Sequence, residues 1–267
     1  MTTNLTLNDG RSIPQLGMGV YKVPDSQTAL VVREGIDIGF RLVDTAAFYE
    51  NERGVGDGTK GSDVFVTTKL APGRHDADQV AAALDESLAL LGRDSVDLYL
   101  IHWPVPSQGK FVEAWRALVE AREAGKALSI GVCNFLPEHL EAIVAATGVT
   151  PAVNQIELHP TFQQRDLQAY DRDHGILTQS WSPLGRGATL ADDRIVAVAA
   201  KHGRSPAQAI IAWHLAKGLA VIPKASDRDH LSDNYAALDL TLDDDDIAAI
   251  DGMDDAEARM GPDPRSM

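Results

Sequence analysis

The stretch Phe40-Arg41-Leu42-Val43-Asp44-Thr45-Ala46-Ala47-Phe48-Tyr49 runs from an apolar segment into a polar one. Residues 40–43 predict a short buried strand, because they are apolar apart from Arg41 and end where polar side chains begin. Asp44 and Tyr49 follow at the point where that strand gives way to a loop. The stretch therefore predicts a carboxylate and a phenol at the carboxyl end of a buried strand.

The same arrangement recurs twice further along the chain. The apolar run 64–68 is followed by Lys69, and the run 96–101 is followed by His102. In a barrel of parallel strands the carboxyl ends of the strands converge on one face, where active sites lie. We therefore expect the carboxylate, the phenol, the ammonium and the imidazole to share one site on that face.

The order of elements along the whole chain favours such a barrel. Apolar runs alternate with longer helical patterns, which is typical of parallel strand–helix–strand units. The expected strands are 17–20, 41–44, 64–68, 97–101, 129–132, 152–156, 177–181 and 220–222. Residues 78–91 carry apolar side chains at helical spacing, and Gly92 suits the end of that helix. Asp9-Gly10, between two short β-like runs, predicts a hairpin over the amino-terminal mouth. The predicted fold is an α/β (β/α)8 TIM barrel with an N-terminal β-hairpin.

Length and composition fit a single barrel domain. The chain has 267 residues, of which 44% are apolar, and one eightfold barrel takes roughly 250 residues. No Pro- or Ser-rich linker and no internal repeat divides it, so residues 1–267 are expected to form one domain. The sequence has no signal peptide and no long apolar run, which predicts a cytoplasmic protein.

Charge and residue spacing argue against several partner classes. The net charge of −15 disfavours nucleic acid and anionic membranes. The single cysteine, Cys133, leaves no internal disulfide and fits a reducing compartment. The histidines lack the spacing of a metal motif, so no metal site is expected. Gly56–Gly61 matches G-x-G-x-x-G, but it precedes a strand, so we do not interpret it as a dinucleotide fingerprint.

The four polar residues at the strand ends can act together as a proton donor. A phenol has an ordinary pKa of about 10, and a nearby ammonium lowers it by favouring the phenolate. Asp44 opposite Lys69 would keep the lysine charged, and His102 could orient a carbonyl group beside Tyr49. Each residue alone also fits a structural role, as a strand-end cap, a surface charge or a core histidine. Their joint position predicts carbonyl reduction, which also needs a hydride source.

Several motifs resemble those of the aldo-keto reductases, from about residue 4 to about residue 255, and most closely the bacterial branch that includes 2,5-diketo-D-gluconate reductases. The motifs are GIDIGFRLVDTA at 35–46, YENE at 49–52, LYLIHWP at 98–104, NQIELHP at 154–160 and IPK at 222–224. The resemblance implies an NADPH-dependent carbonyl reductase without metal. In that family Tyr49 would be the acid, Lys69 and Asp44 its tuners, and His102 the carbonyl-orienting group.

The resemblance also implies a cofactor site and a substrate site. Amides at Asn134 and Gln155 would hold the nicotinamide carboxamide, since amides both donate and accept, and Trp181 would stack on the ring. The loop after Trp181 would follow the pyrophosphate, Lys224 would meet the 2′-phosphate, and the segment around 233–234 would contact adenine. The implied cofactor residues are Val20, Tyr21, Cys133, Asn134, Gln155, Trp181, Ser182, Leu184, Gly185, Gly187, Lys224, Ser226, Arg228, His230, Asp233 and Asn234. The implied substrate-binding residues are Tyr21, Phe48, His102 and Trp103.

Some positions depart from the family pattern. Cys133 stands where a serine is frequent, and His230 stands where related reductases usually have arginine. Asp227 adds negative charge near the expected phosphate, while Lys224 and Arg228 remain as cations. We therefore expect NADPH as cofactor with NADH not excluded, and a preference for NADPH that increases as pH falls through about 6.5.

Three functions compete at this point. The first is an NAD(P)H-dependent reductase that acts as a monomer on a small carbonyl compound. The second is an inactive dinucleotide-binding barrel that serves as a sensor or accessory subunit, for which the complete proton-donating set has no use. The third is a metal-assisted barrel hydrolase, which the missing ligand clusters disfavour.

Overall fold

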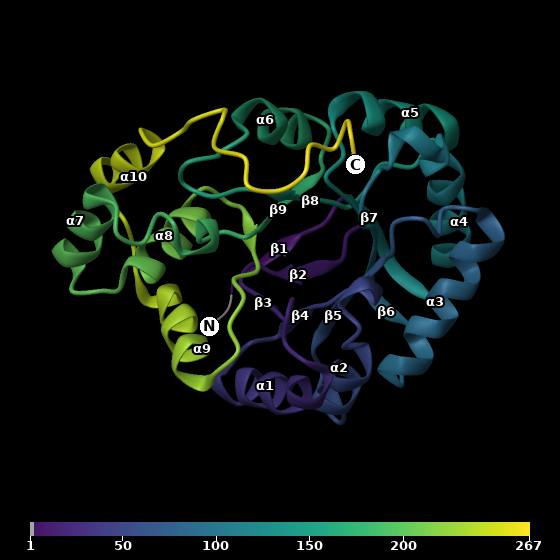
Figure 1. Ribbon diagram of the computed structural model, residues 1–267, viewed down its shortest axis with the longest axis horizontal. Coiled ribbons are helices and arrows are strands. Elements are labelled where there is room, and N and C mark those ends of the chain that lie inside the picture. The colour runs from purple at the N-terminus through teal and green to yellow at the C-terminus, as the bar shows by residue number, and fades with distance from the viewer. Residues whose placement is uncertain (1–2) are drawn as a thin grey trace.

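A ring of eight parallel strands forms the centre of the computed structural model, which describes residues 3–267 (Figure 1). Each strand pairs with its neighbours in chain order, from β3 to β10. The strands are β3 (Met18–Gly19), β4 (Leu42–Asp44), β5 (Phe65–Leu70), β6 (Val96–Ile101), β7 (Ala127–Cys133), β8 (Val153–Glu157), β9 (Leu177–Trp181) and β10 (Ala220–Val221). All eight expected strands are present, and their ends differ from the expected ones by at most two residues.

The first and last strands close the ring. The amide of Gly17 donates to the carbonyl of Val221 over 2.9 Å, and the amide of Gly19 donates to that of Pro223 over 3.1 Å. A Cβ at Gly19 would lie 3.1 Å from the carbonyl oxygen of Ile222, so the close approach favours glycine there. This closure confirms the predicted (β/α)8 barrel.

Helices form the outer layer around the strands (Figure 1). The α-helices are α1 (Asp25–Ile38), α2 (Glu52–Thr59), α3 (Ala77–Leu91), α4 (Phe111–Glu123), α5 (Pro137–Thr147), α6 (Arg165–Asp173), α7 (Asp193–His202), α8 (Pro206–Ala216), α9 (Arg228–Tyr235) and α10 (Asp244–Asp251). Short 3-10 turns are η1 (Ala47–Tyr49), η2 (Pro106–Gln108), η3 (Gly185–Gly187) and η4 (Ala236–Asp239). The helix expected at 78–91 is α3, which ends at Gly92 in the left-handed conformation. No helix among the described residues is long and apolar enough to cross a membrane.

The N-terminal hairpin covers the amino-terminal side of the barrel. It consists of β1 (Asn4–Thr6) and the antiparallel β2 (Ser12–Pro14). Its turn is anchored on the barrel, because Asn8 donates to the carbonyl of Pro151 just before β8 and Ser129 of β7 donates to Asp9 over 2.6 Å. Ile13 of β2 is fully buried against the barrel. The hairpin and its predicted place are confirmed.

The glycine-rich stretch Gly56–Gly61 has a packing role. Its first residues belong to α2, and they let this helix lie close to its neighbours. A Cβ at Gly56 would lie 2.5 Å from the carbonyl oxygen of Leu91 at the end of α3, and one at Gly58 would lie 2.7 Å from Cβ of Val32 in α1. These contacts account for the glycines without a bound dinucleotide.

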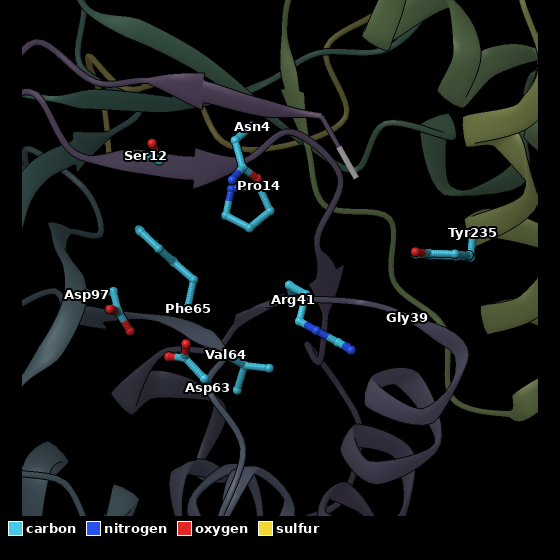
Figure 2. A pocket seen from close by; sticks show the side chains of 10 residues that line it. All are labelled: Asn4, Ser12, Pro14, Gly39, Arg41, Asp63, Val64, Phe65, Asp97 and Tyr235. Carbon is cyan, nitrogen blue, oxygen red and sulfur yellow. The ribbon is translucent and has the colours of Figure 1, made fainter. Parts of the chain in front are cut away.

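A cavity of about 470 Å³ lies beside the hairpin, near the starts of β4 and β5 (Figure 2). Its walls include Ser12, Arg41, Asp63, Asp97 and Tyr235. None of the predicted site residues lines it, since it opens near the amino ends of the strands. The candidate site is built at the opposite, carboxyl ends.

Candidate active site

A buried ion pair lies at the centre of the site. Nζ of Lys69 is 2.6 Å from Oδ1 of Asp44, and the side chains are 0% and 2% exposed. Lys69 also donates to the carbonyl of Thr45 over 2.8 Å, and Gln155 donates to Oδ2 of Asp44 over 2.8 Å. Burial alone would lower the pKa of Lys69, but Asp44 raises it above its ordinary value, so the lysine stays charged. Lys69 lies within β5, one residue before its end, and not just past it as expected.

Tyr49 lies beside this ion pair at the end of η1. Its hydroxyl is 3.5 Å from Nζ of Lys69, and its ring lies 4.9 Å from that of Tyr21. Burial raises the pKa of Tyr49 to about 12, although Lys69 lowers it as expected. The expectation of a lowered pKa is therefore wrong in direction, because the cost of burying the phenolate exceeds the attraction of the ammonium. The phenol is protonated at neutral pH.

His102 faces Tyr49 from the end of β6. The two ring centroids are 5.7 Å apart and the ring planes meet at 74°. Burial, aided by the charge of Lys69, lowers the pKa of His102 to about 3, so the imidazole is neutral at physiological pH. A neutral imidazole can orient a carbonyl oxygen through a hydrogen bond, but it is a poor proton donor. The structure thus brings together all four residues of the predicted catalytic set.

Sequence reasoning missed the side chains that hold this set in place. Thr45 donates from Oγ1 to Asn51 over 2.6 Å, and Asn51 donates to the carbonyls of Val20 and Val23. Asn51 is fully buried, although it stands in a polar stretch that resembles an exposed loop. Gln179 accepts from Gln155 over 2.8 Å. Its position two residues before Trp181 on β9 was the available signal, because alternate residues of a strand share a face.

The predicted nicotinamide residues form one cluster next to His102. Asn134 follows β7 in the left-handed conformation, with a φ of 62°. Its Nδ2 donates to the carbonyl of His102 over 3.1 Å, and its Oδ1 accepts from Nε1 of Trp181 over 2.9 Å. Gln155 is adjacent, since its carbonyl accepts from the amide of Asn134. The structure therefore places two amides and an indole ring on one wall beside the imidazole.

The segment after Trp181 is a tight turn over the barrel mouth. Ser182, Gly185 and Gly187 all have positive φ, of 50°, 54° and 88°. Glycine adopts such angles without strain. The amides of Gly185 and Gly187 donate within the turn, to the carbonyls of Ser182 and Leu184 over 2.9 Å each. Leu184, which precedes Gly185, is partly buried. The turn is thus closed by its own backbone, and its contact with a pyrophosphate stays a prediction.

The predicted phosphate-binding cations lie around the start of α9. Lys224, Ser226 and Arg228 are exposed there. Asp227 caps the helix by accepting from the amide of His230, and its other oxygen is 2.6 Å from Nδ1 of His230. This hydrogen bond raises the pKa of His230 and lowers that of Asp227. The expected titration near 6.5 is therefore corrected to a higher pH, because the carboxylate stabilises the imidazolium.

Several implied cofactor residues have structural partners. Asp233 accepts from Ser205 over 2.7 Å and from Gln208 over 2.8 Å, so its carboxylate holds the start of α8. Asn234 is buried at 4% exposed. Val20 and Cys133 are 0% exposed as whole residues, so the structure gives neither an exposed atom for a ligand.

The implied substrate residues differ in exposure. Tyr21 and Phe48 are 46% and 63% exposed, and the Phe48 ring lies 6.3 Å from that of His102. Trp103 is buried at 8% exposed. Phe48 and Tyr21 therefore form an open aromatic rim. Within residues 3–267, no group of three or more His, Cys, Asp or Glu side chains is placed to hold a metal ion.

Comparison with known proteins decides the family. The sequence model described as "Aldo/keto reductase family" matches residues 15–255. The chain belongs to the aldo-keto reductase family. A relative named aldo-keto reductase, from Mycolicibacterium smegmatis, is 44% identical over 100% of this chain and 98% of its own. The methylglyoxal reductase DkgA of Escherichia coli is 43% identical over 98% of this chain and 97% of its own.

Solved structures agree with this assignment. A crystal structure of a Gox0644 point mutant in complex with NADPH matches with a TM-score of 0.98 and 49% identity, covering 100% of this chain and 99% of that one. The recognition of the family from the sequence motifs is confirmed, and the reductase is an NAD(P)H-dependent enzyme. Its own donor set fits a nicotinamide dinucleotide, with two amides and an indole beside the imidazole and exposed cations at α9.

Proposed function

We propose that this reductase converts aldehyde or ketone carbonyls to alcohols with Tyr49 as the proton donor. The observation that carries this proposal is the 3.5 Å contact between the Tyr49 hydroxyl and Nζ of Lys69, opposite a neutral His102. The Tyr49 phenol is protonated at neutral pH, whereas the neutral His102 imidazole is a poor proton donor. The ammonium of Lys69 lies beside the phenol. NADPH is the cofactor of this proposal, held by the implied residues, and NADH is not excluded.

The side chains divide the work of the reaction. NADPH, when bound, supplies a hydride to the carbonyl carbon. His102 donates a hydrogen bond that orients the carbonyl oxygen, and Tyr49 gives its proton to that oxygen. The charge of Lys69 stabilises the phenolate that develops as the proton leaves, and Asp44 fixes the position of Lys69. The high pKa of Tyr49 keeps the proton in place until the carbonyl oxygen gains negative charge.

The relatives suggest a class of substrate. The name of DkgA is methylglyoxal reductase, and its sequence aligns with nearly the whole chain. We extend this activity to the present reductase, so that a small 2-oxoaldehyde would enter between Phe48 and Tyr21. We further propose that residues 1–267 act as one domain, as a monomer and in the cytoplasm.

Replacement of the acid tests the mechanism. Tyr49→Phe keeps the ring and its packing but loses the donor, so kcat/KM for methylglyoxal should fall by at least about 100-fold. NADPH binding, measured by fluorescence titration, should be unchanged. Tyr170→Phe, on α6 away from the site, is the matched control and should keep full activity.

Two results would contradict this proposal. Near-normal turnover in Tyr49→Phe would show that another group donates the proton. A wild-type protein that binds NADPH but oxidises it with no member of an aldehyde panel would instead favour the inactive sensor or accessory barrel.

A further inference from the structure

Glu157 is a buried carboxylate that the proposed chemistry does not use. It is the last residue of β8 and is 1% exposed. Its Oε1 accepts from the amide of Met260 over 2.7 Å, and its Oε2 accepts from that of Gly261 over 2.8 Å. Nε2 of His159 lies 3.2 Å from Oε1. Burial alone would raise the pKa of Glu157, but these three contacts lower it below its ordinary value, so the group is ionised.

The segment that Glu157 holds is the C-terminal tail, residues 254–267. It leaves α10 and crosses α6, β8 and β9 to end near β7, as the yellow trace in Figure 1 shows. Its beginning is fixed by the amide of Asp255, which donates to the carbonyl of Thr161 over 2.9 Å. Near its end, Arg265 lies 3.7 Å from Glu138 of α5. The hydrogen bonds to Glu157 therefore fix the middle of the C-terminal tail where it crosses the barrel mouth.

The C-terminal tail lies against residues of the implied cofactor site. Glu157 and Trp181 are register partners on the adjacent strands β8 and β9. A Cβ at Gly261 would lie 2.6 Å from Cη2 of Trp181 and 2.8 Å from Oε2 of Glu157. Only a residue without a side chain can approach the indole this closely. Cε of Met260 would lie 3.5 Å from a Cβ at Gly185, in the turn after Trp181.

The indole of Trp181 is consequently held from two sides. Its Nε1 donates a hydrogen bond to Oδ1 of Asn134, and Cη2 and Cζ2 of its six-membered ring lie against Gly261. The turn at Gly185 lies against Met260 of the tail, next to that ring. In the implied placement the nicotinamide stacks on the indole and the pyrophosphate follows this turn, and both lie against the part of the tail that Glu157 fixes.

We propose that Glu157 is a positioning residue that holds the C-terminal tail against Trp181 and Gly185, and that this contact slows the release of NADPH. The inference rests on the proposed placement of the cofactor against these two residues. It assigns the acidic residue of the NQIELHP motif to cofactor retention, and it makes the tail part of the cofactor site.

Two substitutions break the contact from opposite sides. Glu157→Gln removes the charge and one of the two acceptor oxygens, whereas Gly261→Ala leaves Glu157 intact and inserts a methyl group between the tail and the indole. Gly252→Ala, at the end of α10, is the control, because its Cβ would meet only ordinary contacts of 3.4 Å and 3.5 Å. The measured quantity is the dissociation rate of NADPH from each full-length protein in a stopped-flow displacement by excess NADP⁺.

We expect Glu157→Gln and Gly261→Ala each to raise the NADPH dissociation rate by about tenfold, the scale of losing one hydrogen bond to a charged group. Gly252→Ala should release NADPH at the wild-type rate. Because Gly261→Ala keeps the carboxylate and its histidine partner, a purely structural role of Glu157 would leave that variant unchanged. Thermal melting identifies any variant that has lost its fold, and Gly261→Ala decides the result if Glu157→Gln does not fold.

Folded variants that both release NADPH at the wild-type rate would overturn the inference. The placement of the cofactor is tested separately, by comparing NADPH quenching of tryptophan fluorescence in the wild type and in Trp181→Phe. If the substitution leaves the quenching unchanged, Trp181 does not face the nicotinamide, and the inference fails with that placement. Carbonyl reduction is measured apart from both tests, so the reductase mechanism can stand when the tail inference fails.

Discussion

Lys69 is an ammonium buried inside a barrel, and all its partners come from the segment between β4 and η1. Asp44, the carbonyl of Thr45 and the hydroxyl of Tyr49 surround it. A buried charge is stable only when it is paired and hydrogen-bonded. The contacts that stabilise the buried charge of Lys69 therefore also hold that charge next to the Tyr49 hydroxyl.

Removal of this charge should affect both stability and activity. Lys69→Met leaves Asp44 buried without its partner, so the free energy of unfolding should fall by about 3–5 kcal/mol. The pKa of Tyr49 should rise further, which moves any alkaline limb of the residual rate upward. The measurements are urea unfolding and a pH–rate profile.

A double variant separates the two effects. In Lys69→Met/Asp44→Asn the unpaired carboxylate is gone, so part of the stability should return while activity stays low. Lys126→Met breaks an exposed pair with Asp85 and should cost at most about 1 kcal/mol. Full activity in Lys69→Met would contradict the role given to the lysine.

At the scale of residues, the sequence predicts the polar side chains at strand ends, but it does not predict the side chains that hold them in place. Asp44, Lys69 and His102 could be predicted, because an apolar run that stops at a polar residue marks a strand end. Asn51 and Glu157 could not, because each is held mainly by backbone groups that are distant in the chain, those of Val20 and Val23 for Asn51 and those of Met260 and Gly261 for Glu157. The pKa of Tyr49 also depends on burial, which a motif does not report.

The start of α9 shows how an element sets the charge that a ligand meets. Asp227 caps the helix and pairs with His230, so one cation of the segment is neutralised by its own neighbour. Lys224 and Arg228 are left as the cations that the proposed site offers to a phosphate. The sequence identified all four charges, but their pairing follows from the helix, which places residues three apart on one face.

Asp227→Asn should increase the preference for NADPH over NADH. Asparagine keeps the capping oxygen and removes the negative charge, so the ratio of kcat/KM values should rise about two- to fivefold, as expected for one exposed charge. In the wild type, this ratio should decline as pH rises through a value above 6.5, where His230 loses its proton. Asp192→Asn, which alters the equivalent cap of α7, should leave the ratio unchanged. A ratio that is constant with pH and in Asp227→Asn would place phosphate recognition elsewhere.

At the scale of the whole molecule, the hairpin and the candidate site lie at opposite ends of the barrel. The hairpin packs Ile13 and Leu7 onto the amino ends of the strands, whereas the site lies at the carboxyl ends. Strand order, the hairpin and the helical layer could be predicted from periodicity and turn residues. The course of the C-terminal tail could not, because residues 254–267 have no periodic pattern and are held by polar contacts with residues distant in the chain, such as Glu157 and Glu138.

Ile13→Ala should therefore destabilise the protein without altering its chemistry. The cavity left under the hairpin should lower the free energy of unfolding by about 2–5 kcal/mol, while kcat/KM at 25 °C stays the same. Leu30→Ala, at a side chain that is 60% exposed, should cost less than about 0.5 kcal/mol. A large loss of kcat/KM in folded Ile13→Ala protein would show that the two ends are coupled.

The closure between Gly17–Gly19 and Val221–Pro223 also has a consequence during synthesis on the ribosome. About two hundred residues separate the two edges, so the first edge waits roughly 10–40 s for its partner at 5–20 residues per second. An unpaired edge can recruit a strand from another nascent chain. Here β3 and β10 are two residues long each. The two strands at the seam that closes last are thus also the shortest of the barrel, and they offer little backbone for a neighbouring chain to join.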